Sequence, residues 1–95
     1  MFIVLLKFSG NKAQAGQFME GHKAWLKRGF DDGVFLMSGN LKPQLGGGII
    51  AQNVSREALL ARVNDDPFVA HDVVAPEIIE FEPSQRQPQL EGLIQ

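Results

Sequence analysis

The chain has 95 residues, 44% of them hydrophobic, and a formal charge of -2, which are ordinary values for a single globular domain. It contains no cysteine, which excludes disulfides, thiolate catalysis and cysteine metal ligands. No basic stripe with interleaved aromatic residues is present, so we expect no nucleic-acid partner. No run approaches the roughly 18 apolar residues that a membrane span needs, so we expect no membrane partner and, by default, a cytoplasmic location.

The first half of the chain predicts a strand, a helix and a second strand. Residues 2–8 form a continuous apolar run that indicates a strand. Apolar residues recur at helical spacing over 13–30, and residues 31–33 (Asp-Asp-Gly) end that helix. Residues 34–37 predict the second strand, and the glycines and proline of 39–47 indicate a long hairpin loop.

The second half predicts a strand, two short helices and a last strand. The third strand is expected at 48–54 and is followed by a helix over 56–63, which Ser55 can cap. A second short helix is expected to start at Pro67, and the last strand covers 73–81.

This order is strand, helix, strand, strand, helix, strand. With right-handed crossovers it predicts an α+β, ferredoxin-like fold, in which a four-stranded antiparallel sheet carries its helices on one face. Pro76 in the last strand indicates an edge or a bulge. We place the domain at residues 1–83 and a Gln- and Pro-rich C-terminal tail at 84–95.

Two predicted strands are apolar on both faces. In the first, Phe2, Val4, Leu6 and Phe8 point one way and Ile3 and Leu5 the other; in the second, Val34 and Leu36 oppose Phe35 and Met37. A sheet with one wet face should alternate apolar and polar residues. Helices cover only one face in this topology, so we expect a homodimer formed by sheet stacking. The alternative is coverage by the tail through Leu90, Leu93 and Ile94.

Two residues are candidates for chemistry. Asp66 followed by Pro67 is a strong helix-start signal, and we rank this structural role above a catalytic one on the residues alone. His22 lies at helical spacing from Phe18 and Trp25, on or beside the apolar face of its helix. A lone histidine there is more often a half-buried structural residue, but a neutral imidazole near an aspartate is a competent general base.

Several segments resemble those of YCII-related (YciI-like) proteins. They are the helix residues His22, Trp25, Leu26 and Gly29, the strand segment 33–39, and the two helix starts at residues 55–58 and 66–68. The resemblance covers roughly residues 1–83. It departs from the family pattern at Asn40, which follows the second-strand glycine, and in the glycine-rich segment 46–48.

The resemblance implies a ferredoxin-like domain that dimerises as a dimeric α/β barrel. It also implies an active site that pairs His22 with Asp66. Some relatives eliminate or isomerise by proton transfer in aromatic breakdown. We expect an enzyme of this type acting on a small organic, aromatic-derived molecule, with substrate contacts from Phe18, Trp25, Ser38 and Phe68.

The other residue patterns indicate no further chemistry. No metal-ligand spacing is present, and residues 46–48 do not form a phosphate loop, so we expect no metal and no cofactor. His71 and Asp72 are read as a surface pair, with a secondary site role left open. A non-catalytic module that binds a small ligand or supports assembly remains the alternative function.

Overall fold

The computed structural model describes residues 1–92. Its helices and strands follow in the order β1 (Phe2–Phe8), α1 (Ala15–Asp31), β2 (Phe35–Leu41), β3 (Gly46–Ala51), α2 (Arg56–Asn64), α3 (Pro67–Ala70) and β4 (Val74–Glu80). Short 3-10 helices at Lys12–Gln14 and Pro88–Leu90 precede α1 and follow β4.

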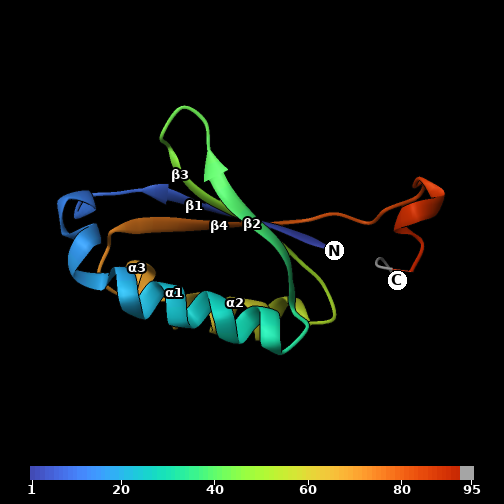
Figure 1. Cartoon of the computed structure of the whole chain (residues 1–95), viewed down its shortest axis with the longest axis horizontal. Helices are drawn as coiled ribbons and strands as arrows, with labels where there is room; N and C mark the ends of the chain where they lie inside the picture. The colour runs from blue at the N-terminus through green and yellow to red at the C-terminus, as the bar shows by residue number, and fades with distance from the viewer. Residues whose placement is uncertain (93–95) are drawn as a thin grey trace.

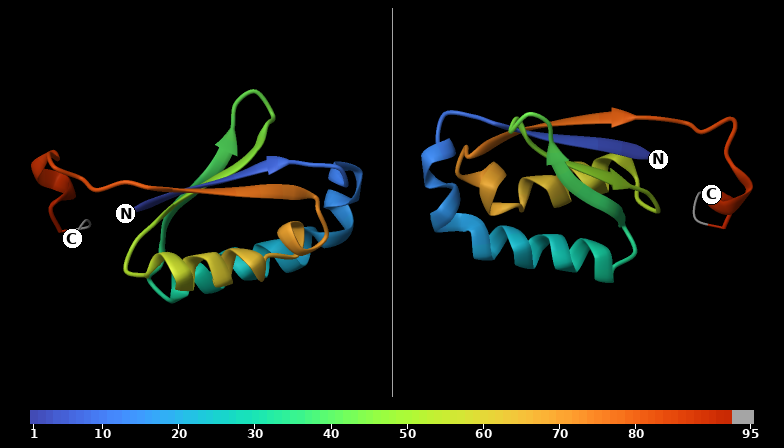
Figure 2. Two further views of the ribbon diagram at one scale, coloured as in Figure 1. Left: turned by 180° about the vertical axis from the view of Figure 1, so that it is seen from behind. Right: turned by 45° about the horizontal axis from the view of Figure 1, so that its top comes forward.

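The strands form one antiparallel sheet in the order β2-β3-β1-β4. All three α-helices lie on the same side of this sheet (Figures 1 and 2). The predicted α+β, ferredoxin-like arrangement is therefore confirmed. β4 pairs only with β1, so Pro76 lies on an edge strand, where its missing N–H is tolerated.

The helix ends agree with the residues that predicted them. Gly33 has a φ of +73°, and its N–H donates to Phe30 O while that of Val34 donates to Gly29 O, the Schellman pattern that closes α1. At the start of α2, the Ser55 hydroxyl accepts a hydrogen bond from the Ala58 N–H at 3.1 Å.

The long hairpin loop predicted over residues 39–47 is wrong. β2 continues to Leu41 and β3 begins at Gly46, so only residues 42–45 form the turn. Gly39 pairs with Gly48, Asn40 with Gly47 and Leu41 with Gly46. Glycine disfavours strands intrinsically, but here pairing to β1 on the other side of β3 holds the segment extended.

The predicted faces of the second strand also need correction. Phe35 pairs with Ala51 and Met37 pairs with Ile50, so Leu36 is an extra residue at a bulge. The bulge shifts the alternation by one position. As a result Phe35 is buried on the helix-facing side, whereas Met37 lies on the opposite face and is 65% exposed. Val34, which precedes β2, is also buried.

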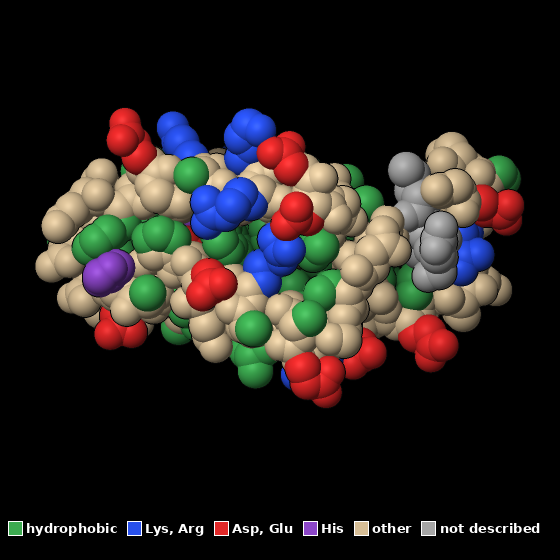
Figure 3. Space-filling model, turned by 90° about the horizontal axis from the view of Figure 1, so that it is seen from below, with side chains coloured by type: hydrophobic (Ala, Val, Ile, Leu, Met, Phe, Trp, Pro, Cys, Tyr) green, Lys and Arg blue, Asp and Glu red, His purple; other side chains and the backbone are tan. Residues whose placement is uncertain are grey.

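The core lies between the sheet and the helices. At one end of this interface Phe2, Trp25, Gly29, Phe35 and Ala51 meet, and we call these residues the packed end. The ring of Trp25 meets that of Phe35 edge-on, with centroids 5.1 Å apart. The outer face of the helical layer carries basic and acidic side chains interspersed, as expected for a solvated surface (Figure 3).

No helix within residues 1–92 covers the other face of the sheet, which displays apolar side chains (Figure 2). Ile3, Leu5 and Ile50 are half-buried there, and Ile79 is exposed. The described part of the tail leads away from the strands (Figures 1 and 2). Leu90 is exposed within it, and the predicted contacts of Leu93 and Ile94 lie outside the described residues. The domain boundary at residue 83 stays a prediction.

No helix within residues 1–92 combines the length and the apolar character that a bilayer crossing requires.

Candidate active site

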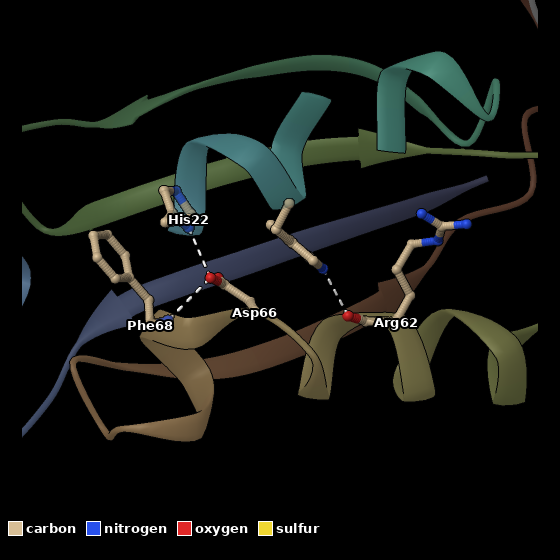
Figure 4. A network of polar contacts seen from close by, with 5 residues as sticks. His22, Arg62, Asp66 and Phe68 are labelled. Carbon is tan, nitrogen blue, oxygen red and sulfur yellow. Dashed lines mark hydrogen bonds and ion pairs between the residues drawn. The ribbon is translucent and has the colours of Figure 1, made fainter. Parts of the chain in front are cut away.

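His22 and Asp66 meet between α1 and the start of α3. The His22 Nδ1 lies 2.8 Å from Asp66 Oδ1, although the two residues are 44 positions apart in the sequence (Figure 4). The predicted contact between these two side chains is therefore confirmed.

Local sequence explains how Asp66 is held. Asp66 is the N-cap of α3, and the same Oδ1 accepts a hydrogen bond from the Phe68 N–H at 3.0 Å. Pro67 supplies the first residue of that helix with its φ already suited to it. Gly21, next to His22, lets α3 approach α1, because a Cβ there would lie 3.0 Å from Pro67 Cγ.

The imidazole of His22 has a fixed orientation. Its ring stacks on that of Phe68 with centroids 4.1 Å apart and planes 5° apart, and its side chain is 14% exposed. An ionised carboxylate only accepts hydrogen bonds, so Nδ1 donates to Asp66 and carries the proton of the neutral ring. Nε2 is then left with the lone pair that a general base needs.

Asp66 is fully buried, and its second oxygen, Oδ2, has no hydrogen-bond partner among residues 1–92. The carboxylate therefore depends on His22 and the Phe68 N–H for its compensation. This position stabilises a positive charge on the imidazole, because a carboxylate out of water interacts strongly with a neighbouring cation.

A cavity of about 290 Å³ opens between α1 and the β1–β3–β2 part of the sheet. Side chains of His22, Phe68 and Val74 meet it, as do residues of α1, β1, β2 and β3. These further residues are Leu6, Phe8, Ala15, Met19, Lys23, Leu26, Ser38, Gly39, Asn40, Gly46, Gly47, Gly48 and Ile49. Asp66 does not line the cavity, so it acts on a ligand only through His22.

The structure brings together some of the predicted site residues and separates others. His22, Ser38 and Phe68 line the cavity. Trp25 does not: it is 1% exposed, and its Nε1–H donates to the Arg62 carbonyl at 2.8 Å (Figure 4). Phe18 does not line it either, and its ring stacks on that of His71 with centroids 4.0 Å apart. The cavity wall is therefore made largely by residues other than the predicted aromatic ones.

Sequence reasoning missed several lining residues. Met19 and Leu26 stand three residues before and four residues after His22, a helical spacing that could have identified them. Asn40 and Gly47 were assigned to a loop, and only their pairing across the β2–β3 hairpin places them in the site. Within residues 1–92 no group of three or more metal-ligating side chains comes together.

Comparison with known proteins agrees with this fold. The model of the YCII-related domain family matches residues 1–82. No curated protein sequence matches the chain.

A similar solved structure is 5-chloro-2-hydroxyhydroquinone dehydrochlorinase (TftG) from Burkholderia phenoliruptrix AC1100 in complex with 2,5-dihydroxybenzoquinone. The TM-score is 0.69 at 16% identity, over 86% of this chain and 94% of that chain. At this level of identity the likeness shows a shared fold.

Proposed function

We propose that this chain, which belongs to the YCII-related domain family, is an enzyme that transfers a proton on a small organic, aromatic-derived molecule. His22 is the general base or acid, and Asp66 positions its ring. The observation that carries the proposal is the 2.8 Å contact from His22 Nδ1 to Asp66 Oδ1 behind a cavity that His22 itself lines.

The geometry supports a simple sequence of steps. Nε2 of the neutral ring removes a proton from the bound molecule, and the resulting imidazolium is stabilised by Asp66. In an elimination the electron pair of the broken bond forms a double bond, and the leaving group departs with its own pair. In an isomerisation the imidazolium returns the proton to another atom of the same molecule. In a hydrolysis the base instead removes a proton from water, and the water oxygen bonds to the electrophilic atom of the bound molecule. The leaving group then departs with the electron pair of its broken bond and takes the proton from the imidazolium.

The residue inventory supports proton transfer without a covalent intermediate. The sequence contains neither Cys nor Tyr, so two common nucleophiles are absent. The structural neighbour is named as a dehydrochlorinase, and loss of hydrogen chloride is an elimination. That name supports the choice of reaction class for this chain without identifying its substrate.

We also propose that the protein is a homodimer that stacks two sheets through their open faces. Met37 is 65% exposed and Ile79 is 40% exposed on that face, and Ile3, Leu5 and Ile50 lie between them. Burying such a surface against a second copy removes apolar area from water. Light scattering at micromolar concentration should give about twice the 10.5 kDa chain mass, and a monomer mass would contradict the proposal.

One observation favours the alternative, a non-catalytic module that binds a small ligand. The bonds that Asp66 makes to the Phe68 N–H and to His22 are those of a helix cap tied to a neighbouring helix. In that case the pair would serve packing alone, and the cavity would serve binding alone.

Replacing His22 tests the two functions against each other. Turnover is sought first on 5-chloro-2-hydroxyhydroquinone and then on other small hydroxylated aromatics. His22→Ala should lower turnover by about 10²–10⁴-fold, the usual contribution of a positioned general base. Met19→Ala, which changes the same cavity without removing a titratable group, is the matched control. Full activity of His22→Ala would eliminate the proposed mechanism.

A further inference from the structure

β3 contains three glycines in a row, and the fold does not need all of them. Gly46 has a φ of +134°, and a Cβ there would collide with the Leu6 carbonyl, so its backbone requires glycine. Gly47 has neither constraint. A Cβ at Gly47 would meet only the Gly39 carbonyl oxygen, at an ordinary 3.5 Å.

Gly47 lies on the helix-facing side of the sheet. It pairs with Leu6 of β1 and with Asn40 of β2, and all three residues line the same cavity as His22. Gly48, one residue on, meets the cavity only with its backbone, because it pairs with Leu5 and a side chain there would face the open side of the sheet. Of these two glycines, Gly47 is thus the one whose missing side chain leaves room inside the cavity.

A glycine in the interior of a strand lowers stability by about 0.5–1 kcal/mol relative to alanine. Where the fold has no use for it, such a glycine often marks a place at which a ligand approaches the backbone closely. The side chains around Gly47 fit this role. Leu6 and Ile49 are apolar, and none of the hydrogen bonds described in residues 1–92 uses the Asn40 amide.

We propose that Gly47 determines which ligands the cavity accepts, and that the ligand class is a flat, single-ring molecule with a hydroxyl or carbonyl substituent. The ring lies against the bare β3 backbone at Gly47, between Leu6 and Ile49. The Asn40 amide bonds the substituent, since it both donates and accepts. This inference rests on the cavity of the proposed function, but it does not depend on catalysis by His22.

The test is a graded series at Gly47 with a matched series at Ala75 of β4. Ala75 is also a small strand residue, but it is exposed, pairs with Lys7 on the open face and does not line the cavity. The probe is 2,5-dihydroxybenzoquinone, titrated into the ¹⁵N-labelled full chain while the backbone amide resonances of residues 46–48 are followed by NMR.

In the unmodified protein these amides should shift with saturation. Gly47→Ala, Gly47→Val and Gly47→Leu should weaken binding progressively, and Gly47→Leu should weaken it by about 10–200-fold, as expected when a pocket loses room for a methylene or more. The Ala75 variants should bind as the unmodified protein does, because Ala75 does not line the cavity. Melting temperatures in the Gly47 series should not fall, because alanine, valine and leucine all suit a strand better than glycine.

Two outcomes would overturn the inference. One is the absence of any probe-dependent shift at residues 46–48 in the unmodified protein, and the other is unchanged probe affinity in Gly47→Leu. The proposed function fails in a different way, through unchanged turnover in His22→Ala. That variant should still bind the probe at Gly47, so the two failures are distinguishable.

Discussion

The two ends of the helix–sheet interface are built from the same elements but differ in what they enclose. At the packed end, a row across the sheet runs from Phe2 through Ala51 to Phe35, with Trp25 of α1 packed against it. At the other end, the row of Leu6, Gly47 and Asn40 lies under the part of α1 that carries His22. We call this second region the cavity end.

The difference arises mainly in β3. Its helix-facing positions are Ala51, Ile49 and Gly47. The position nearest the cavity end therefore has no side chain. Packing at the packed end holds α1 at its distance from the sheet. The space over Gly47 is therefore left unfilled. The site is therefore produced by an absent side chain at Gly47 beside the tightly held ring of His22.

The largest expected effect is on the packed end. Trp25 is 1% exposed and bonds to the Arg62 carbonyl, so Trp25→Ala should lower the free energy of unfolding by about 3–5 kcal/mol. Met19 lines the cavity and is 36% exposed, so Met19→Ala should change it by about 0.5 kcal/mol or less. Urea unfolding monitored by circular dichroism measures both, and equal losses would contradict the division into two ends.

Replacing a glycine with alanine should also affect the stability of the two ends differently. At Gly29 a Cβ would run into the ring of Phe35, so Gly29→Ala should lower the free energy of unfolding by about 1–3 kcal/mol. This loss should appear although alanine favours a helix over glycine by about 1 kcal/mol. Gly47→Ala, whose Cβ would make an ordinary 3.5 Å contact with the Gly39 carbonyl oxygen, is the control and should show no loss. If Gly29→Ala were more stable than the unmodified protein, the ring of Phe35 would be able to move aside, and the packed end would not be rigid.

Replacing Asp66 should have a smaller effect on stability and a separate effect on the protonation of the His22 ring. Asp66→Ala removes the N-cap of α3 and should lower the free energy of unfolding by about 1 kcal/mol. Asp66→Asn keeps most of the cap, because asparagine caps helices about as well, but it removes the charge beside His22. The oxygen that accepts from the Phe68 N–H also accepts from His22 Nδ1, so Asp66→Asn should keep the proton of the neutral ring on Nδ1, whereas Asp66→Ala should not. ¹⁵N NMR of the imidazole measures the difference. An unchanged tautomer in Asp66→Ala would show that Asp66 does not set it.

The sequence predicted the elements that depend on local signals. Ser55 and the Asp66-Pro67 pair identified two helix starts, because a helix cap depends on residues that are adjacent in the sequence. The His22–Asp66 contact was predicted through a family resemblance, since no local pattern relates residues 44 positions apart. The catalytic role of the pair remains a proposal.

What the sequence did not predict depends on partners distant in the chain. The glycines of 46–48 indicate a loop in the sequence, and only their pairing with β1 makes them part of a strand. Trp25 shares helical spacing with His22, but its indole N–H donates to the Arg62 carbonyl of α2. The spacing of apolar residues within α1 gives no information about this contact with another helix. The bulge at Leu36, which decides the faces of β2, likewise exists only through the pairing with β3.

The smallest expected effect concerns Arg62, whose side chain lies at the edge of the packed end. Its guanidinium pairs with Asp32 at 2.9 Å, but the two side chains are 25% and 55% exposed. Water and salt screen such a pair, so Arg62→Ala should lower the free energy of unfolding by about 1 kcal/mol or less. The bond from Trp25 uses the Arg62 backbone carbonyl and survives the substitution. Urea unfolding at low and high salt measures the loss, which should shrink as salt increases, and Asp32→Asn should reproduce most of it. A loss as large as that of Trp25→Ala, insensitive to salt, would mean that the stem of Arg62 belongs to the packed end and that this region extends to the surface of α2.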